Sequence, residues 1–129
     1  MPPTHPYGEL IDRTAVTYGL DAGLLTAQIQ IESSFDPWAF RYEVGFYKNY
    51  IVGMPDEELT VRPPCSRSTE ELMRATSWGL MQVMGQVARE RGFKCVFLSG
   101  LCDPEIGIEF GCRHFNAILE SRNGDIAAS

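Results

Sequence analysis

The stretch Ile29–Pro37, IQIESSFDP, places the carboxylate of Glu32 near the end of an apolar segment, just before residues that stop a helix. Pro37 lacks a backbone N–H and restricts the residue before it to extended geometry. Upstream, Asp21 is a favourable N-cap residue, so we predict a helix that Asp21 caps and that runs through Ser34. The quoted stretch is therefore the C-terminal end of this helix.

Glu32 shares one face of the predicted helix with apolar residues, by the three-or-four spacing rule. That face carries Leu24, Leu25, Gln28, Ile31, Glu32 and Phe35. A carboxyl group desolvated there has its neutral form favoured, and the negative end of the helix dipole acts in the same direction. Both effects suit a general acid. The alternative is that Glu32 lies at the edge of the stripe, in water or paired with a cation such as Arg41, and the pattern alone does not decide between them.

Two further helices are predicted, one before the helix that Asp21 caps and one after a long loop. The first runs from Tyr7 to Tyr18 and is ended by Gly19. The other begins in the capping-box pattern Ser68–Glu71 and runs to about residue 75. Between Trp38 and Arg67 the chain is rich in Tyr, Phe, Pro and Gly and has no sustained period, which indicates a long, partly ordered loop.

The C-terminal half is also predicted to be helical. Ser77–Gly92, SWGLMQVMGQVARERG, is expected to form a helix whose inward residues are Met81, Met84, Val87 and Ala88. Asp103-Pro104 is an N-cap followed by proline at the first helical position, and the helix is expected to end at Asn123-Gly124. Its buried face would carry Ile108, Cys112, Phe115 and Leu119, with Gly107 and Gly111 allowing close helix approach. Residues 125–129 resemble the first turn of another helix. No alternating strand pattern is evident, so we predict a mainly α fold.

Length and charge limit the functional classes. The 129 residues are predicted to form one domain, residues 1–129. The net charge of −6, without a Lys/Arg cluster, argues against nucleic acid and anionic lipid as partners. The N-terminus MPPTHPYGEL is unlike a signal peptide, and no apolar run approaches the roughly 20 residues of a membrane span. Localisation and oligomeric state stay open.

The cysteines allow two interpretations. Cys65, Cys95, Cys102 and Cys112 could form up to two disulfides, with a connectivity that the sequence does not give. With His114 they could also suggest zinc, but the ligand spacings are loose and no C-x-x-C pair is present. We therefore predict no metal and no cofactor.

Three motifs occur in order along the chain: IESSFDPWA at residues 31–39, SWGLMQVMG at 77–85 and LCDPEIGIEFGCRHF at 101–115. Together they resemble the catalytic domain of lytic transglycosylases of the soluble type, within the lysozyme-like superfamily that includes goose-type lysozyme. The family order is a helix ending in glutamate-serine, a variable loop, a serine and glycine opening a G-L-M-Q segment, and a D-P-x-x-N-I-x-x-G-like helix. The resemblance covers nearly the whole chain and implies a lysozyme-like α-helical domain with a long irregular insertion.

The resemblance implies roles for the matched residues. The family's single catalytic acid/base falls on Glu32, with Ser33 as its usual neighbour and substrate contact. Ser77, Gly79, Leu80, Met81 and Gln82 match the segment that lines the sugar groove, with polar contacts from Ser77 and Gln82 and an apolar wall from Met81. For Leu80 and Met84 we prefer a core role, and for Trp78 a core role slightly over a sugar platform.

The implied substrate is the peptidoglycan glycan strand, cut between N-acetylmuramic acid and N-acetylglucosamine in the cell wall. Glu32 would protonate the glycosidic oxygen and then deprotonate the muramic C6 hydroxyl, which closes a 1,6-anhydro ring. A hydrolytic lysozyme would need a second carboxylate to activate water, with Asp36 and Glu43 as candidates. However, Asp36 precedes proline, where a turn role is commoner, and Glu43 is expected to pair with the possible auxiliary residue Arg41. A non-catalytic glycan-binding or architectural domain is the third alternative.

Two departures from the family pattern stand out. The insertion from Trp38 to Thr76 is longer than in compact members, and its Tyr42, Phe46, Tyr47 and Tyr50 are expected to fold against the groove, most of them at least half buried. The A-Y-N-x-G segment that follows the last matched helix in the family is missing, and its tyrosine normally lies near the catalytic glutamate. The chain is therefore interpreted as C-terminally truncated, which puts its activity in question.

Overall fold

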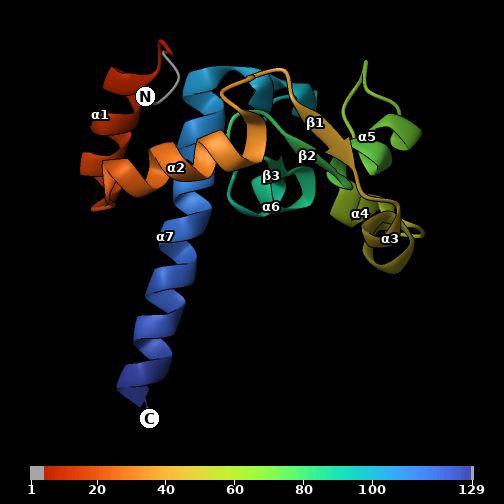
Figure 1. The fold of residues 1–129 in the computed structure, drawn as a ribbon. Coiled ribbons are helices and arrows are strands. Elements are labelled where there is room, and N and C mark those ends of the chain that lie inside the picture. The colour runs from red at the N-terminus through yellow and green to blue at the C-terminus, as the bar shows by residue number, and fades with distance from the viewer. Residues whose placement is uncertain (1–4, 129) are drawn as a thin grey trace.

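The structure is a computed structural model that describes the backbone of residues 5–128 and the side chains of residues 5–122. It is mainly helical with one small sheet, which confirms the predicted fold class (Figure 1). The α-helices are α1 (Gly8–Tyr18), α2 (Ala22–Ser33), α3 (Val44–Phe46), α4 (Asp56–Leu59), α5 (Arg67–Arg74), α6 (Gly85–Glu90) and α7 (Pro104–Ala128). A π-helix, η1 (Tyr47–Ile51), and a 3-10 helix, η2 (Leu98–Cys102), complete the helical elements. The strands β1 (Phe40–Tyr42), β2 (Thr76–Trp78) and β3 (Val83–Met84) form an antiparallel sheet in the order β1-β2-β3.

The first two helices begin and end within one residue of the predicted positions. Gly19 ends α1 in the left-handed region with φ of 65°. The Asp21 side chain caps α2 by accepting from the Leu24 backbone N–H at 2.9 Å. Helix α2 ends at Ser33, so Glu32 lies in its last turn.

The predicted single helix over Ser77–Gly92 is wrong. The chain instead forms β2, a turn, β3 and then the short helix α6. Two residues of the turn, Gly79 and Gln82, have φ of 75° and 49°, in the left-handed region, which a continuous helix does not allow. Strand β1 pairs with β2 in the register Phe40↔Trp78, so the insertion supplies the third strand.

The predicted loop from Trp38 to Arg67 is also more ordered than expected. It contains β1, α3, η1 and α4. Its Ile51, Met54 and Leu59 form a second core cluster together with Ala75 at the end of α5. Phe46 and Tyr47 pack on this cluster, Tyr42 is 41% exposed and Tyr50 is 68% exposed. The expectation that most of the four insertion aromatics are at least half buried is confirmed. Phe46 and Tyr47 pack on the insertion's own core, and the rings of Tyr42 and Tyr50 lie beside them, Tyr42 by Tyr47 and Tyr50 by Phe46.

Helix α5 begins two residues earlier than the capping-box pattern indicated. Ser66 is the N-cap, and its hydroxyl accepts from the Thr69 backbone N–H at 3.1 Å. With the cap at Ser66, the third residue after it is Thr69, so Glu71 does not serve as a box residue, and its neighbour Glu70 is buried at 2% exposed. Its carboxylate accepts from Arg74 Nε at 2.7 Å on α5 and from an Arg89 guanidinium nitrogen at 2.9 Å on α6. This ion-pair network joins the insertion side of the molecule to α6.

Helix α7 anchors the main core with its first half. Ile108 and Cys112 are fully buried. A Cβ on Gly107 would lie 2.7 Å from the Leu101 carbonyl oxygen, and one on Gly111 would lie 2.5 Å from the Met81 sulfur, so both glycines permit the predicted close approach. The Tyr18 hydroxyl donates to Glu109, which joins the end of α1 to α7.

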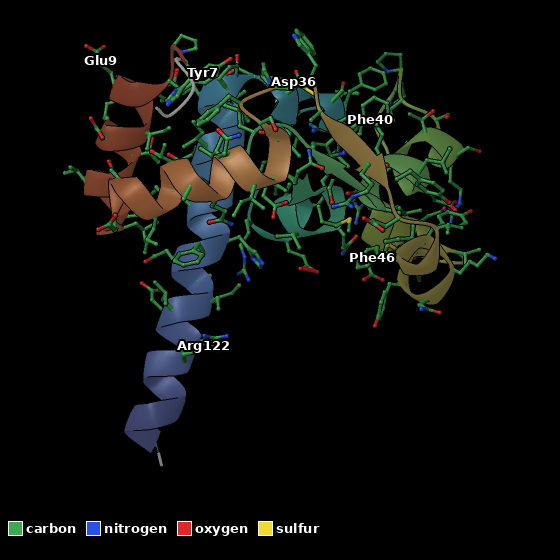
Figure 2. The ribbon with its side chains drawn as sticks, in the orientation of Figure 1. Tyr7, Glu9, Asp36, Phe40, Phe46 and Arg122 are labelled. Carbon is green, nitrogen blue, oxygen red and sulfur yellow. The ribbon has the colours of Figure 1, made fainter. Side chains whose placement is uncertain are left out.

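The second half of α7 departs from the prediction. The backbone stays helical through Asn123-Gly124 to Ala128, because one glycine costs a helix only about 1 kcal/mol. Residues 125–128 thus belong to α7, and Ser129 lies outside the described residues. Phe115 and Leu119, expected on the buried face, are 38% and 36% exposed. Figure 1 shows this half extending beyond the other elements, and Arg122 lies on it in Figure 2.

Candidate active site

A cavity of about 370 Å³ lies where α2, the β2–β3 hairpin, α6 and α7 meet. Its lining comprises Gln28, Glu32, Ser77, Met81, Gln82, Val83, Met84, Val87, Gly111, His114, Phe115 and Ile118. Glu32, Ser77, Met81 and Gln82, which the sequence singled out on separate motifs, are thus brought to one cavity. We take this cavity as the candidate site.

A larger cavity of about 640 Å³ lies on the other side of α6, beside the Glu70 network. Arg74, Arg89 and Glu70 line it, and their charged groups pair with one another. Arg89 also donates to the carbonyls of Phe93 and Cys95. The motif residues of the smaller cavity do not line it, and its central charges hold the fold together.

Glu32 lies on the cavity side of α2 but is exposed. The predicted apolar stripe is wrong in part, because Leu24 is 70% and Ile31 82% exposed. The buried face of α2 is formed by Leu25 and Ile29. The buried face of α2 therefore differs from the predicted one, and Glu32 lies at the solvent-accessible rim of the cavity.

Ser33 connects the end of α2 to the hairpin. Its hydroxyl donates to the Leu80 carbonyl at 2.8 Å and lies 3.2 Å from the Ile29 carbonyl of its own helix. Ser33 is not among the cavity-lining residues. In this structure its hydroxyl fixes the turn of helix that carries Glu32, and its contact with substrate stays a prediction.

The hairpin turn is held by close packing and by an amide. Gly79 has φ of 75°, and a Cβ there would lie 2.6 Å from the Leu101 carbonyl oxygen. The Gln82 Nε2 donates to the carbonyls of Ala39 and Gly79, each at 3.0 Å. These contacts place Ser77 on β2, 9% exposed, and Met81, 6% exposed, against the cavity.

The core assignments of the remaining motif residues are mixed. Leu80 is 1% exposed and belongs to the main core, as predicted. Trp78 packs against that core, as preferred, and its Nε1 donates to the Met73 carbonyl at 3.0 Å. Met84 was expected in the core, but it is only half-buried and lines the cavity, because β3 presents it to the site.

The two candidates for a second carboxylate lie elsewhere. Asp36 accepts from the Trp38 backbone N–H at 2.9 Å, the expected turn role. Glu43 pairs with Arg41 at 3.2 Å, as predicted; the Arg41 side chain is 69% exposed and that of Glu43 is 41% exposed. Neither Asp36 nor Glu43 lines the cavity, nor do the four insertion aromatics, so the insertion does not form the expected wall there. Among the described residues that line it, Glu32 is the sole carboxylate.

The model of the Transglycosylase SLT domain family matches residues 9–129. The chain belongs to this family. No curated protein and no solved structure matches the chain. Membership indicates action on peptidoglycan of the lytic transglycosylase type.

Several cavity residues of the SLT domain were missed by sequence reasoning. Gln28 lies one helical turn before Glu32, and this spacing was the available signal. His114, Phe115 and Ile118 come from α7. In the sequence, His114 was considered only for a zinc site that was rejected, Phe115 was placed on the buried face, and Ile118 had no role. His114 follows Gly111 by one turn, so the close approach at Gly111 brings it to the site.

Among the described residues of the SLT domain, no group of three or more His, Cys, Asp or Glu side chains is placed to hold a metal ion. The four cysteines are free thiols, of which Cys95 is exposed and the others are buried. Burial raises the pKa of the Cys112 thiol to about 11. None of the helices in the described part of the chain has the length and apolar character of a membrane span.

Proposed function

We propose that this SLT domain cleaves the β-1,4 bond between N-acetylmuramic acid and N-acetylglucosamine and leaves a 1,6-anhydro-N-acetylmuramic acid end. The observation that carries the proposal is the single carboxylate of the cavity. Glu32 lines it together with Ser77, Met81 and Gln82, while Asp36 and Glu43 do not. A lytic transglycosylase needs one acid/base, whereas an inverting hydrolase needs a second carboxylate roughly 6.5 to 9.5 Å away.

In the proposed reaction, protonated Glu32 donates its proton to the glycosidic oxygen as the bond to the muramic C1 breaks. The N-acetylglucosamine side leaves as an alcohol. The resulting Glu32 carboxylate then takes the proton of the muramic C6 hydroxyl, and the C6 oxygen bonds to C1 to close the anhydro ring. The proton balance closes and no water is consumed.

The remaining cavity groups suit a glycan. Ser77 and Gln82 carry polar groups that can contact sugar hydroxyls or N-acetyl groups, and Met81 and Val83 provide an apolar wall. Because Glu32 is exposed, the bound glycan itself must displace water from the carboxyl group. The substrate would therefore supply part of the desolvation that Glu32 needs in order to act as an acid.

The test is product analysis on purified peptidoglycan. The intact protein should release muropeptides that mass spectrometry shows to be about 18 Da lighter than hydrolytic products, the mass of one water. Glu32→Gln should abolish release, because it keeps the shape of the side chain and removes proton transfer. Glu9→Gln is the matched control, since Glu9 is also an exposed helical glutamate and points outward from α1 (Figure 2).

Each other outcome assigns a different function. Ordinary reducing ends would replace the proposal with a hydrolytic lysozyme. No release by the protein, combined with its retention on sedimented peptidoglycan, would identify a non-catalytic glycan-binding domain. Equal activity of Glu32→Gln and the parent chain would remove Glu32 from the mechanism.

A further inference from the structure

We propose that His114 is a second glycan-contacting residue of the cavity, acting as a neutral imidazole whose Nε2–H donates to a hydroxyl or acetamido oxygen of the bound sugar. The inference rests on the proposed function, because the same cavity must take the glycan. His114 comes from α7, whereas Glu32 comes from α2, so the two groups lie on different walls of the cavity.

The hydrogen bond at the other ring nitrogen determines the tautomer. Arg91 Nε donates to His114 Nδ1 at 3.4 Å. A guanidinium group can only donate, so Nδ1 must accept and carries no proton. In the neutral ring the proton then resides on Nε2, which is left as a donor.

The surroundings keep the imidazole neutral near pH 7. Burial lowers the pKa of His114, and the positive charge of Arg91 lowers it further. Glu90, on α6, opposes this by raising the pKa, but the net direction is downward. The remaining charged group of the cavity is Glu32 on α2. Neutral His114 therefore adds polarity to the site without adding charge.

A neutral Nε2–H donor suits uncharged oxygen acceptors. Sugar hydroxyls and acetamido carbonyls are such acceptors, and N-acetylated glycans present them along the whole strand. The same tautomer excludes His114 as a base toward water, because Nδ1 is occupied by Arg91 and Nε2 already holds a proton. The sole other titratable group that lines the cavity among the described residues thus binds substrate and does not supply the hydrolytic base.

The tautomer is tested in the free protein. The chain has two histidines, so His5→Phe leaves one imidazole and keeps an aromatic ring stacked on Phe35. Nitrogen NMR of that protein should show Nδ1 unprotonated and Nε2 protonated. Arg91→Met should raise the pKa of His114, because the repelling charge is removed. A protonated Nδ1 in the neutral ring would overturn the inference.

Ligand contact is tested in the Glu32→Gln background, so that the result does not depend on catalysis. The probe is a hexamer of N-acetylglucosamine, and its addition should shift the Nε2–H signal of His114. His114→Ala should weaken hexamer binding about three- to tenfold, the effect of one neutral hydrogen bond. His114→Gln should retain most of the affinity because its amide can donate, and His5→Ala should leave affinity unchanged.

The outcomes separate the two proposals. If the hexamer binds and His114→Ala binds it equally well, the role of His114 is overturned and the glycan site stands. If the hexamer binds to neither the Glu32→Gln protein nor the parent chain, the inference fails together with the glycan assignment of the cavity. Circular dichroism of each variant distinguishes a lost contact from a lost fold.

Discussion

Gln82 combines a strained backbone with two useful hydrogen bonds. Its φ of 49° lies in the left-handed region, which costs a non-glycine residue roughly 1–2 kcal/mol. Its amide donates to Ala39, in the segment after α2, and to Gly79 in the turn. The side chain therefore ties the segment that follows Glu32 to the hairpin that forms the opposite wall of the site.

We expect Gln82→Ala to lower the free energy of unfolding by about 2 kcal/mol, because two hydrogen bonds are lost while the left-handed geometry remains. Gln82→Gly loses the same bonds but relieves the backbone, so it should be about 1 kcal/mol more stable than the alanine variant. Urea denaturation of the three proteins measures both differences. An alanine variant at least as stable as the glycine variant would contradict the strain argument.

Individual residue roles were predictable where they depend on local chemistry. The turn at Asp36 and the Arg41–Glu43 ion pair follow from neighbours in the sequence, and both are present. The exposure of Glu32 was not predictable. Which face of α2 is buried depends on the packing of Ile29 and Leu25 into a core built from distant segments, and the helix itself is apolar nearly all round.

Among the elements, the hairpin and α6 show why one stretch was misassigned. Apolar residues in SWGLMQVMG recur at spacings that suit a helix, and strands of two or three residues are too short to show alternation. The deciding feature is nonlocal. A Cβ on Gly85 would lie 2.8 Å from Arg74 Cα and close to the Met73 carbonyl, so α6 begins where only glycine fits against α5.

We therefore expect Gly85→Ala to destabilise the protein by about 3 kcal/mol, since the backbone of α5 cannot move aside cheaply. Gly8→Ala is the matched control. Gly8 is also the first residue of its helix, α1, and a Cβ there meets nothing within 4 Å. That change should be neutral or stabilising by up to about 1 kcal/mol. Thermal denaturation compares them, and equal stability of the two variants would show that α6 can shift away from α5.

On the scale of the whole molecule, two core clusters are joined by the Glu70 network. The main cluster packs α1, α2 and α7, and the smaller one lies under the insertion. The helical class, the N-terminal helices and the start of α7 were predictable because caps and periodicity are local. The second cluster was not. The Glu70–Arg74 pair is an i,i+4 pair within α5, but Arg89 joins it only when α5 and α6 pack together, so the full network was not predictable either.

The pH dependence of stability should show two steps on acidification. His114 has a pKa lowered from 6.5, by burial and by Arg91, so the folded state binds its proton less tightly than the unfolded chain. The contribution of His114 to the free energy of unfolding is complete above pH 6.5 and is lost as the pH falls toward its lowered folded-state pKa. Burial favours the neutral form of Glu70, but the hydrogen bonds from Arg89 and Arg74 outweigh it and lower the pKa from 4.5. The contribution of Glu70 to the free energy of unfolding is present above pH 4.5 and is lost below it.

We expect the free energy of unfolding to decline first below about pH 6.5 and then more steeply below about pH 4.5. His114→Gln should remove the upper step and leave the lower one, because glutamine does not titrate. Arg91→Met should shrink the upper step, since it removes one of the two causes that lower the pKa of His114. Urea titrations at closely spaced pH values measure both steps. An upper step that persists unchanged in His114→Gln would show that another group carries it, and it would also weaken the case that His114 is held neutral in the folded protein.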